Sequence, residues 1–153
     1  DEDEAFAAMT YRTHTVFRRY SGESLVRIGP LTFTFFKANH TEPSYAVRAS
    51  CRERVVVFSG DTAYSDSVVK AAVEADLFFC ECSLYNAFAG MVEGHLTAGE
   101  AGAIARKAGA KELVLTHLPH YGSHADLIKE AAHEFGGPLR LNEAGLVWKL
   151  APS

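Results

Sequence analysis

Short runs of β-branched and aromatic residues, each ended by turn residues, recur along the chain from residue 25 onward. Val55, Val56, Val57 and Phe58 form one such run, and the turn sequence Ser59-Gly60-Asp61-Thr62 ends it. An unbroken apolar run of this length is typical of a strand buried on both faces of a sheet. The other runs predict further strands over Leu25–Ile28, Leu31–Ala38, Tyr45–Ser50, Leu77–Cys82 and Leu113–Thr116, and a closing hairpin of Leu139–Leu141 with Leu146–Leu150.

Other segments of the chain carry apolar residues at the three- and four-residue spacing of amphipathic helices. The pattern predicts helices over Glu4–Tyr20, Ser67–Ala75, Thr97–Ala108 and Ala125–Phe135. Thr97 and Glu100 have the spacing of a capping box, which marks the start of a helix, and Gly109 marks its end. Ser83–Gly94 has no clear period and is predicted to be a loop. The alternation of strands and helices indicates an α/β domain.

The 153 residues amount to one domain, and 48% hydrophobic and 22% charged residues are ordinary for a soluble globular protein. No apolar run approaches the length of a membrane span, and the start of the chain does not read as a signal peptide. The four acidic residues that open the chain account for its whole net charge of −4, so the rest is balanced and gives no footprint for long nucleic acid.

Three cysteines in apolar contexts, Cys51, Cys80 and Cys82, favour reduced thiols and a cytoplasmic location. Cys80 and Cys82 lie two residues apart on one predicted strand and therefore face the same side. This placement favours core packing over a metal site.

Residues with metal-binding side chains follow directly on predicted strands at His40, Asp61 and His117, while His95 precedes the helix that begins at Thr97. Imidazole nitrogens together with a carboxylate suit zinc, manganese or iron, and a carboxylate has two oxygens with which to bridge two cations. Each position also has a purely structural explanation. An aspartate after a strand often caps the next turn, and a single histidine in a loop is commonly a polar surface residue.

Four segments of the chain resemble the C-terminal half of metallo-β-lactamase-fold hydrolases, in the branch that includes ribonuclease Z and small phosphodiesterases. They read KANHTEPSYAVR, VVVFSGDTAYS, ADLFFCECSLYN and GHLTAGEAGAIARKAGAKELVLTHLPHY, in the order and at the spacing of that family. The resemblance implies one half of an αβ/βα sandwich, with a mixed sheet that carries its helices on one face. The other face of the sheet is then expected to be apolar and to need a partner layer.

The resemblance also implies a role for each residue of the site. His40 corresponds to a ligand of a first metal ion, Asp61 to the carboxylate that bridges two ions, and His117 to a ligand of the second. His95 corresponds to a histidine that positions or protonates the phosphate and leaving group, and Glu81 to an acidic residue that orients it. The cofactors implied are two divalent metal ions, with zinc favoured and manganese the alternative.

The chain departs from the family at one point, because the motif H-x-H-x-D-H is absent from it. That motif lies on the N-terminal half of the fold and supplies further metal ligands. Residues 1–153 are therefore expected to form a single domain that corresponds to the C-terminal half. The N-terminal half would come from the same or another chain, and the intact protein is expected to be a homodimer.

The function that the resemblance implies is hydrolysis of a small or cyclic phosphodiester, such as a cyclic nucleotide, by a hydroxide bound between the two metals. The short segment between His40 and Asp61 leaves no room for the tRNA-gripping arm of ribonuclease Z, which argues against tRNA 3′ processing. A lactone or thioester substrate would use the same ligands and stays open. So does an inactive fragment or half-site subunit that needs a separate N-terminal half.

Overall fold

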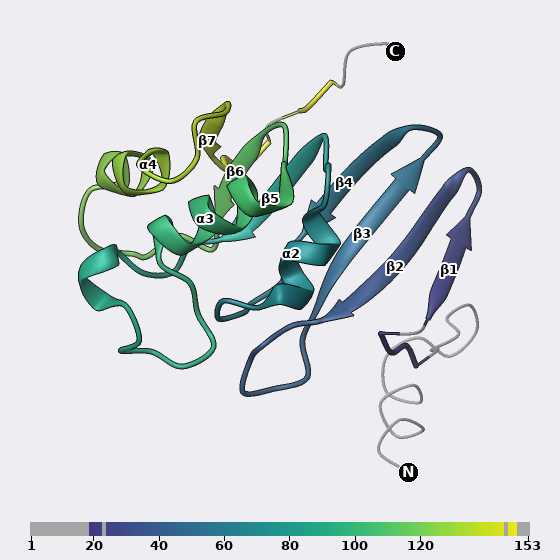
Figure 1. Cartoon of the computed structure of the whole chain (residues 1–153), viewed down its shortest axis with the longest axis horizontal. Helices are drawn as coiled ribbons and strands as arrows, with labels where there is room; N and C mark the ends of the chain where they lie inside the picture. The colour runs from purple at the N-terminus through teal and green to yellow at the C-terminus, as the bar shows by residue number, and fades with distance from the viewer. Residues whose placement is uncertain (1–18, 23, 146, 150–153) are drawn as a thin grey trace.

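A single seven-stranded sheet forms the centre of the computed structural model, which describes residues 19–22, 24–145 and 147–149 (Figure 1). The strands lie side by side in chain order: β1 (Leu25–Ile28), β2 (Leu31–Lys37), β3 (Tyr45–Cys51), β4 (Arg54–Phe58), β5 (Leu77–Glu81), β6 (Leu113–Thr116) and β7 (Leu139–Leu141). Strands β1 to β4 pair antiparallel, and β4 to β7 pair parallel. The sheet is therefore mixed, as predicted.

Three helices connect the parallel strands and cover one face of the sheet (Figure 1). They are α2 (Asp66–Ala72), α3 (Ala98–Ala108) and α4 (His124–Ala132). The core lies between this face and the helices, and its largest fully buried members include Phe78, Leu113 and Leu115 of the sheet with Ile104 and Leu127 of the helices. A parallel connection needs such a crossover, and the apolar stripe of each helix is what holds it on the sheet.

The sequence of α3 explains where the helix begins and where it ends. Thr97 Oγ1 accepts a hydrogen bond from the Glu100 N–H at 3.2 Å, and Glu100 Oε2 accepts one from the Thr97 N–H at 2.9 Å, which completes the predicted capping box. Gly109 then ends the helix in the left-handed conformation, with φ of 65°.

The face of the sheet away from the helices is apolar in the described part of the chain. The register places Phe33 opposite Ala49 and Phe35 opposite Val47, and Val47 lies opposite Phe58 on β4. The Phe58 ring stacks on Phe79 of β5 at 4.7 Å between centroids, yet Phe58 remains 47% exposed. The predicted apolar face is confirmed, and the partner layer that would cover it stays a prediction.

The predicted strands and helices are confirmed to within a few residues, except at the two ends of the chain. The helix predicted over Glu4–Tyr20 lies almost wholly outside the described residues. The closing hairpin is wrong, because residues 147–149 form no strand. Instead Trp148 lies against Phe79 at 5.5 Å between ring centroids and its indole N–H donates to Glu112 at 3.1 Å, while β7 pairs with β6.

The loop predicted over Ser83–Gly94 contains one short 3₁₀ turn, η1 (Asn86–Phe88). None of the helices in the described residues is long and apolar enough to cross a membrane.

Candidate metal centre

Three parallel strands bring their carboxyl ends to one edge of the sheet, and the candidate donors stand there. Asp61 follows β4, Glu81 is the last residue of β5, and His117 follows β6 directly. Strand β5 pairs with β6 so that Glu81 lies opposite Thr116, one residue before His117. This edge is where open α/β sheets bind their ligands.

His40 reaches the same edge from the antiparallel half of the sheet. Asn39 and Ala63 form an isolated bridge, in which the Ala63 N–H donates to the Asn39 carbonyl at 2.7 Å. The Asn39 N–H in turn donates to Thr62 Oγ1 at 3.1 Å. These bonds tie the residue before His40 to the residues that follow Asp61, so two segments distant in sequence are held together.

The four predicted residues converge in the structure. Asp61 Oδ1 lies 3.1 Å from His117 Nδ1. Donor atoms of His40, Asp61 and His95 all lie within 4.8 Å of one another, and so do those of Glu81, His95 and His117. Asp61 is thus close to both His40 and His117, which is the position that a bridging carboxylate requires.

Glu81 is 1% exposed and contacts the His95 ring. Its Oε1 lies 2.8 Å from His95 Nδ1 and accepts the Thr62 N–H at 3.0 Å. Its Oε2 accepts the Ser83 N–H at 3.1 Å and the Ser83 hydroxyl at 3.0 Å. These four donors satisfy the buried Glu81 carboxylate. The contact of Glu81 with Nδ1 in turn fixes the ring orientation of His95, with Nε2 away from Glu81.

Ser83 is a site residue that the sequence reasoning missed. Its Oγ lies 3.3 Å from His95 Nδ1 and 3.1 Å from His117 Nδ1, in addition to its bond with Glu81. Ser83 therefore connects the Glu81–His95 pair to His117. The available signal was its position two residues after Glu81, at the same edge of the sheet as the other donors.

Backbone conformation at the centre is unusual at two residues. His117 has a positive φ of 51°, a left-handed conformation that residues other than glycine rarely adopt and that is concentrated at functional sites. Gly94, with φ of 82°, packs on His40 so closely that a Cβ there would lie 2.8 Å from His40 Cδ2. The absence of a side chain at Gly94 therefore leaves the space that the His40 ring occupies.

The donor set fits divalent cations. The Asp61 and His117 side chains are 47% and 49% exposed, so both are accessible to a cation from solvent. The His95 side chain is 19% exposed. A cavity of about 210 Å³ beside them is lined by Phe58, Ser59, Gly60, Asp61, Phe79, Glu81, Thr116 and His117. Imidazole and carboxylate donors suit Zn²⁺ and Mn²⁺. The assignment of each ligand to a particular ion stays a prediction.

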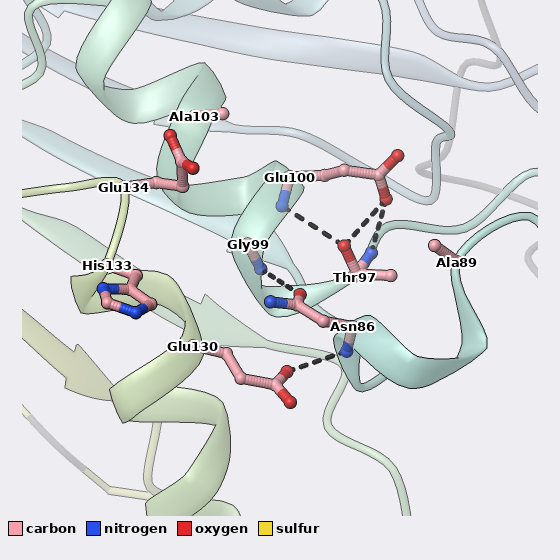
Figure 2. A pocket seen from close by; sticks show the side chains of 9 residues that line it. All are labelled: Asn86, Ala89, Thr97, Gly99, Glu100, Ala103, Glu130, His133 and Glu134. Atoms are coloured by element: carbon pink, nitrogen blue, oxygen red, sulfur yellow. Dashed lines mark hydrogen bonds between the residues drawn. The ribbon is translucent and has the colours of Figure 1, made fainter.

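A second cavity, of about 330 Å³, lies where the loop before α3 meets α4 (Figure 2). The Asn86 side-chain oxygen accepts the Gly99 N–H, and Glu130 accepts the Asn86 N–H, both at 2.8 Å. Glu100 caps α3, and Glu134 pairs with Arg106 at 2.9 Å. Each carboxylate of this cavity already has a partner. We therefore interpret the contacts of Asn86 with Gly99 and Glu130 as the anchor of the loop that leads to His95.

The three cysteines are free thiols, and Cys80 and Cys82 are fully buried. Burial, and next the charge of Glu81, raise the pKa of Cys80 well above its usual range and that of Cys82 to about 12. Both remain protonated thiols in the core, and neither belongs to the metal-binding groups found among the described residues.

The chain is similar in sequence to a known protein family and to individual proteins. The sequence profile of the beta-lactamase superfamily domain matches residues 5–118. The chain is 41% identical over 146 residues to "Probable metallo-hydrolase YhfI" of Bacillus subtilis, covering 95% of this chain and 60% of that protein. It is 35% identical over 113 residues to a ribonuclease Z of Methanosarcina mazei, covering 65% of this chain and 37% of that protein.

Solved structures agree with the sequence matches. The crystal structure of the metallo-β-lactamase-fold protein YhfI from Bacillus subtilis superposes with a TM-score of 0.88 at 40% identity, over 96% of this chain and 61% of that one. The short form of human tRNase Z superposes with a TM-score of 0.57 at 29% identity, over 62% and 38% of the two chains. The chain thus spans about 60% of the length of YhfI.

Proposed function

The chain belongs to the metallo-β-lactamase superfamily, and on this premise we propose that it is the part of a metal-dependent hydrolase that cleaves a small or cyclic phosphodiester. One observation carries the proposal. Asp61 Oδ1 lies 3.1 Å from His117 Nδ1 and close to His40, beside an imidazole that a buried carboxylate holds in place. Candidate metal ligands and a candidate proton donor thus share one edge of the sheet.

His40, Asp61 and His117 would hold the two proposed divalent ions, zinc or manganese. When bound, the ions would activate water and neutralise charge on the phosphoryl oxygens. His95 would donate a proton to the leaving oxygen from Nε2, since its Nδ1 is occupied by Glu81 at 2.8 Å. Glu81 would stabilise the imidazolium and keep the ring in one orientation.

Two features favour a small substrate over tRNA, although ribonucleases Z are among the relatives. The chain between His40 and Asp61 is used by the β3–β4 hairpin, in which Cys51 lies opposite Arg54 and only Arg52 and Glu53 form the turn. No tRNA-gripping arm fits there. In addition, the residues that line the two cavities beside His117 include neither lysine nor arginine, within the part of the chain that the structure describes, whereas Lys37 lines a separate cavity beside His40.

The apolar face of the sheet supports a partner layer that would complete the metal ligands. In the superfamily's sandwich the N-terminal half covers this face, and the length of YhfI relative to this chain leaves room for such a half. We propose that the H-x-H-x-D-H half, in the same or another chain, packs on Phe35, Val47 and Phe58. A homodimer of the intact protein is the further expectation.

Metal-dependent turnover is the direct test. The full-length gene product is freed of metal by chelation, reloaded with Zn²⁺ or Mn²⁺, and assayed with bis-p-nitrophenyl phosphate, cyclic nucleotides, a lactone and a tRNA precursor. We expect phosphodiester hydrolysis that is lost on chelation and regained with metal. Preferred turnover of the lactone would change the substrate class. Absence of turnover with every substrate, in protein with full metal content, would favour the inactive subunit.

A further inference from the structure

An apolar cavity of about 330 Å³ opens beside the candidate metal centre. Its lining includes Ser83, His95 and His117 of the candidate centre together with Leu84, Val92, Leu118, Pro119, His120 and Tyr121. Its volume is at the lower limit for small-molecule sites, which run from about 300 to 1,000 Å³. Because His95 and His117 of the proposed reaction site line this cavity, it is placed to receive the rest of a substrate.

Tyr121 lines this cavity and is 52% exposed. Its ring lies 5.8 Å from that of Tyr85 and 6.1 Å from that of Phe88, the latter nearly perpendicular. The Tyr85 hydroxyl donates to the Tyr121 carbonyl at 2.9 Å. The backbone of Tyr121 is therefore held, while about half of the residue remains exposed.

Another lining residue, Val92, is also apolar and exposed. Val92 is 47% exposed, and its neighbour Met91 is 71% exposed. Large apolar side chains gathered beside a polar centre mark a ligand site more often than scattered surface residues do. A planar aromatic ring, inserted between Val92 and Tyr121, would cover both.

We propose that this cavity binds a planar aromatic ring that the substrate carries next to its scissile phosphodiester, with Tyr121 as the residue that selects for it. The proposal deepens the proposed function and rests on it for the phosphate. Rings stack on aromatic side chains offset or edge-on, and the apolar side chains of the walls suit a ring better than a charged group. Sugar or alkyl phosphodiesters without an aromatic ring would lack this contact.

Direct binding tests the cavity apart from catalysis. Phenyl phosphate and methyl phosphate carry the same phosphate and differ in the ring, so the ratio of their dissociation constants isolates the cavity's contribution. The ratio is measured by calorimetry on the Zn²⁺-loaded full-length gene product. We expect phenyl phosphate to bind about tenfold more tightly.

Variants assign that preference to named residues. Tyr121→Ala should abolish it, Tyr121→Phe should keep it, and Val92→Trp should abolish it by filling the cavity. Tyr64→Ala, which truncates a tyrosine outside this cavity, is the matched control and should leave it unchanged. Circular dichroism confirms that each variant folds.

The outcomes separate the two proposals. An equal affinity for the two phosphates, or a preference that survives either Tyr121→Ala or Val92→Trp, overturns the aromatic site even if the protein hydrolyses phosphodiesters. A preference that behaves as expected, in a protein that hydrolyses no phosphodiester, supports the aromatic site and overturns only the proposed reaction.

Discussion

Strand β5 has a buried carboxylate at each end, and the two differ in what balances their charge. Asp76, just before the strand, accepts hydrogen bonds from Lys111 at 2.8 Å, from Arg54 at 3.2 Å and from the Val55 N–H at 2.8 Å. Glu81, at the other end, is held by neutral donors and by His95. Lysine and arginine are always charged near neutral pH, whereas histidine gains and loses its proton there.

We interpret this difference as one between a structural carboxylate and a carboxylate with a proposed role in the reaction. Asp76 has its counter-charge within the chain, so it needs nothing from solution. Glu81 and the nearby Asp61 have histidines as their ion-pair partners, so the edge around them is left short of positive charge. That deficit is what divalent cations would correct.

The largest effect is expected from Asp61→Ala. Removing this carboxylate takes away the group between the two proposed ions, so we expect activity to fall by more than about 10⁴-fold together with metal content. Stability should change by less than about 1 kcal/mol, since the side chain is half exposed. Metal analysis and turnover are measured on one preparation, with Asp66→Ala as an exposed acidic control. Full metal content and a near-normal rate would remove Asp61 from the mechanism.

His95→Ala should have a smaller effect of a different kind. The metals would stay in place and one proton donor would be lost, which typically costs about 10²–10⁴-fold in rate. Turnover of esters with poor leaving groups should fall most, because such groups need protonation as they depart. His133→Ala, a surface histidine at the end of α4, is the control. Equal losses for good and poor leaving groups would contradict the role of His95 as an acid.

Glu81→Gln sharpens the comparison because it removes charge and keeps shape. The amide can accept at only one position, so two of the four donors would face an NH₂ group, and we expect about 1–3 kcal/mol of lost stability. The rate should fall by about 10–10²-fold, since His95 is present but less well oriented. Denaturant unfolding and kinetics are measured together. An unchanged rate would make Glu81 purely structural, like Asp76.

Asp76→Asn is expected to lower stability without touching activity. Burial raises the pKa of Asp76, but the hydrogen bonds from Lys111, the Val55 N–H and Arg54 together lower it by more, so the net pKa lies below its ordinary value. A carboxylate whose pKa is depressed by folding stabilises the protein above its unfolded pKa of about 4, and this contribution is lost as pH falls further.

The measurement for Asp76→Asn is urea unfolding at two pH values. We expect the variant to lose about 1–3 kcal/mol at pH 7 relative to the unsubstituted protein, and the difference to shrink near pH 3. A difference that is independent of pH would mean that the charge of Asp76 contributes nothing.

The sequence predicted the strands and most helix limits because their signals are local. The apolar run before Asp61 and the capping box at Thr97 depend only on neighbouring residues, and both are found in the structure. The closing hairpin failed because the alternation after Gly145 says nothing about where Trp148 lies, which contacts on Phe79 and Glu112 decide.

Convergence of His40, Asp61, His95 and His117 at one edge could be predicted only with the help of the family resemblance. Strand ends place residues at an edge, but the distance between them depends on register and on bridges such as Asn39 to Ala63. Ser83 could not be assigned from its type, since serine after a strand is common in turns. Of its three polar partners, Glu81 is two residues away, whereas His95 and His117 lie 12 and 34 residues further along the chain.

The left-handed backbone at His117 sets stability against function at a single residue. Glycine adopts a φ of 51° without the steric cost that a side chain brings, so His117→Gly would relieve roughly 1 kcal/mol of strain. The same change would delete the imidazole beside Asp61. Selection for thermal stability alone would favour glycine at this position, and an engineering screen that scores only melting temperature would therefore erase the site it was meant to preserve.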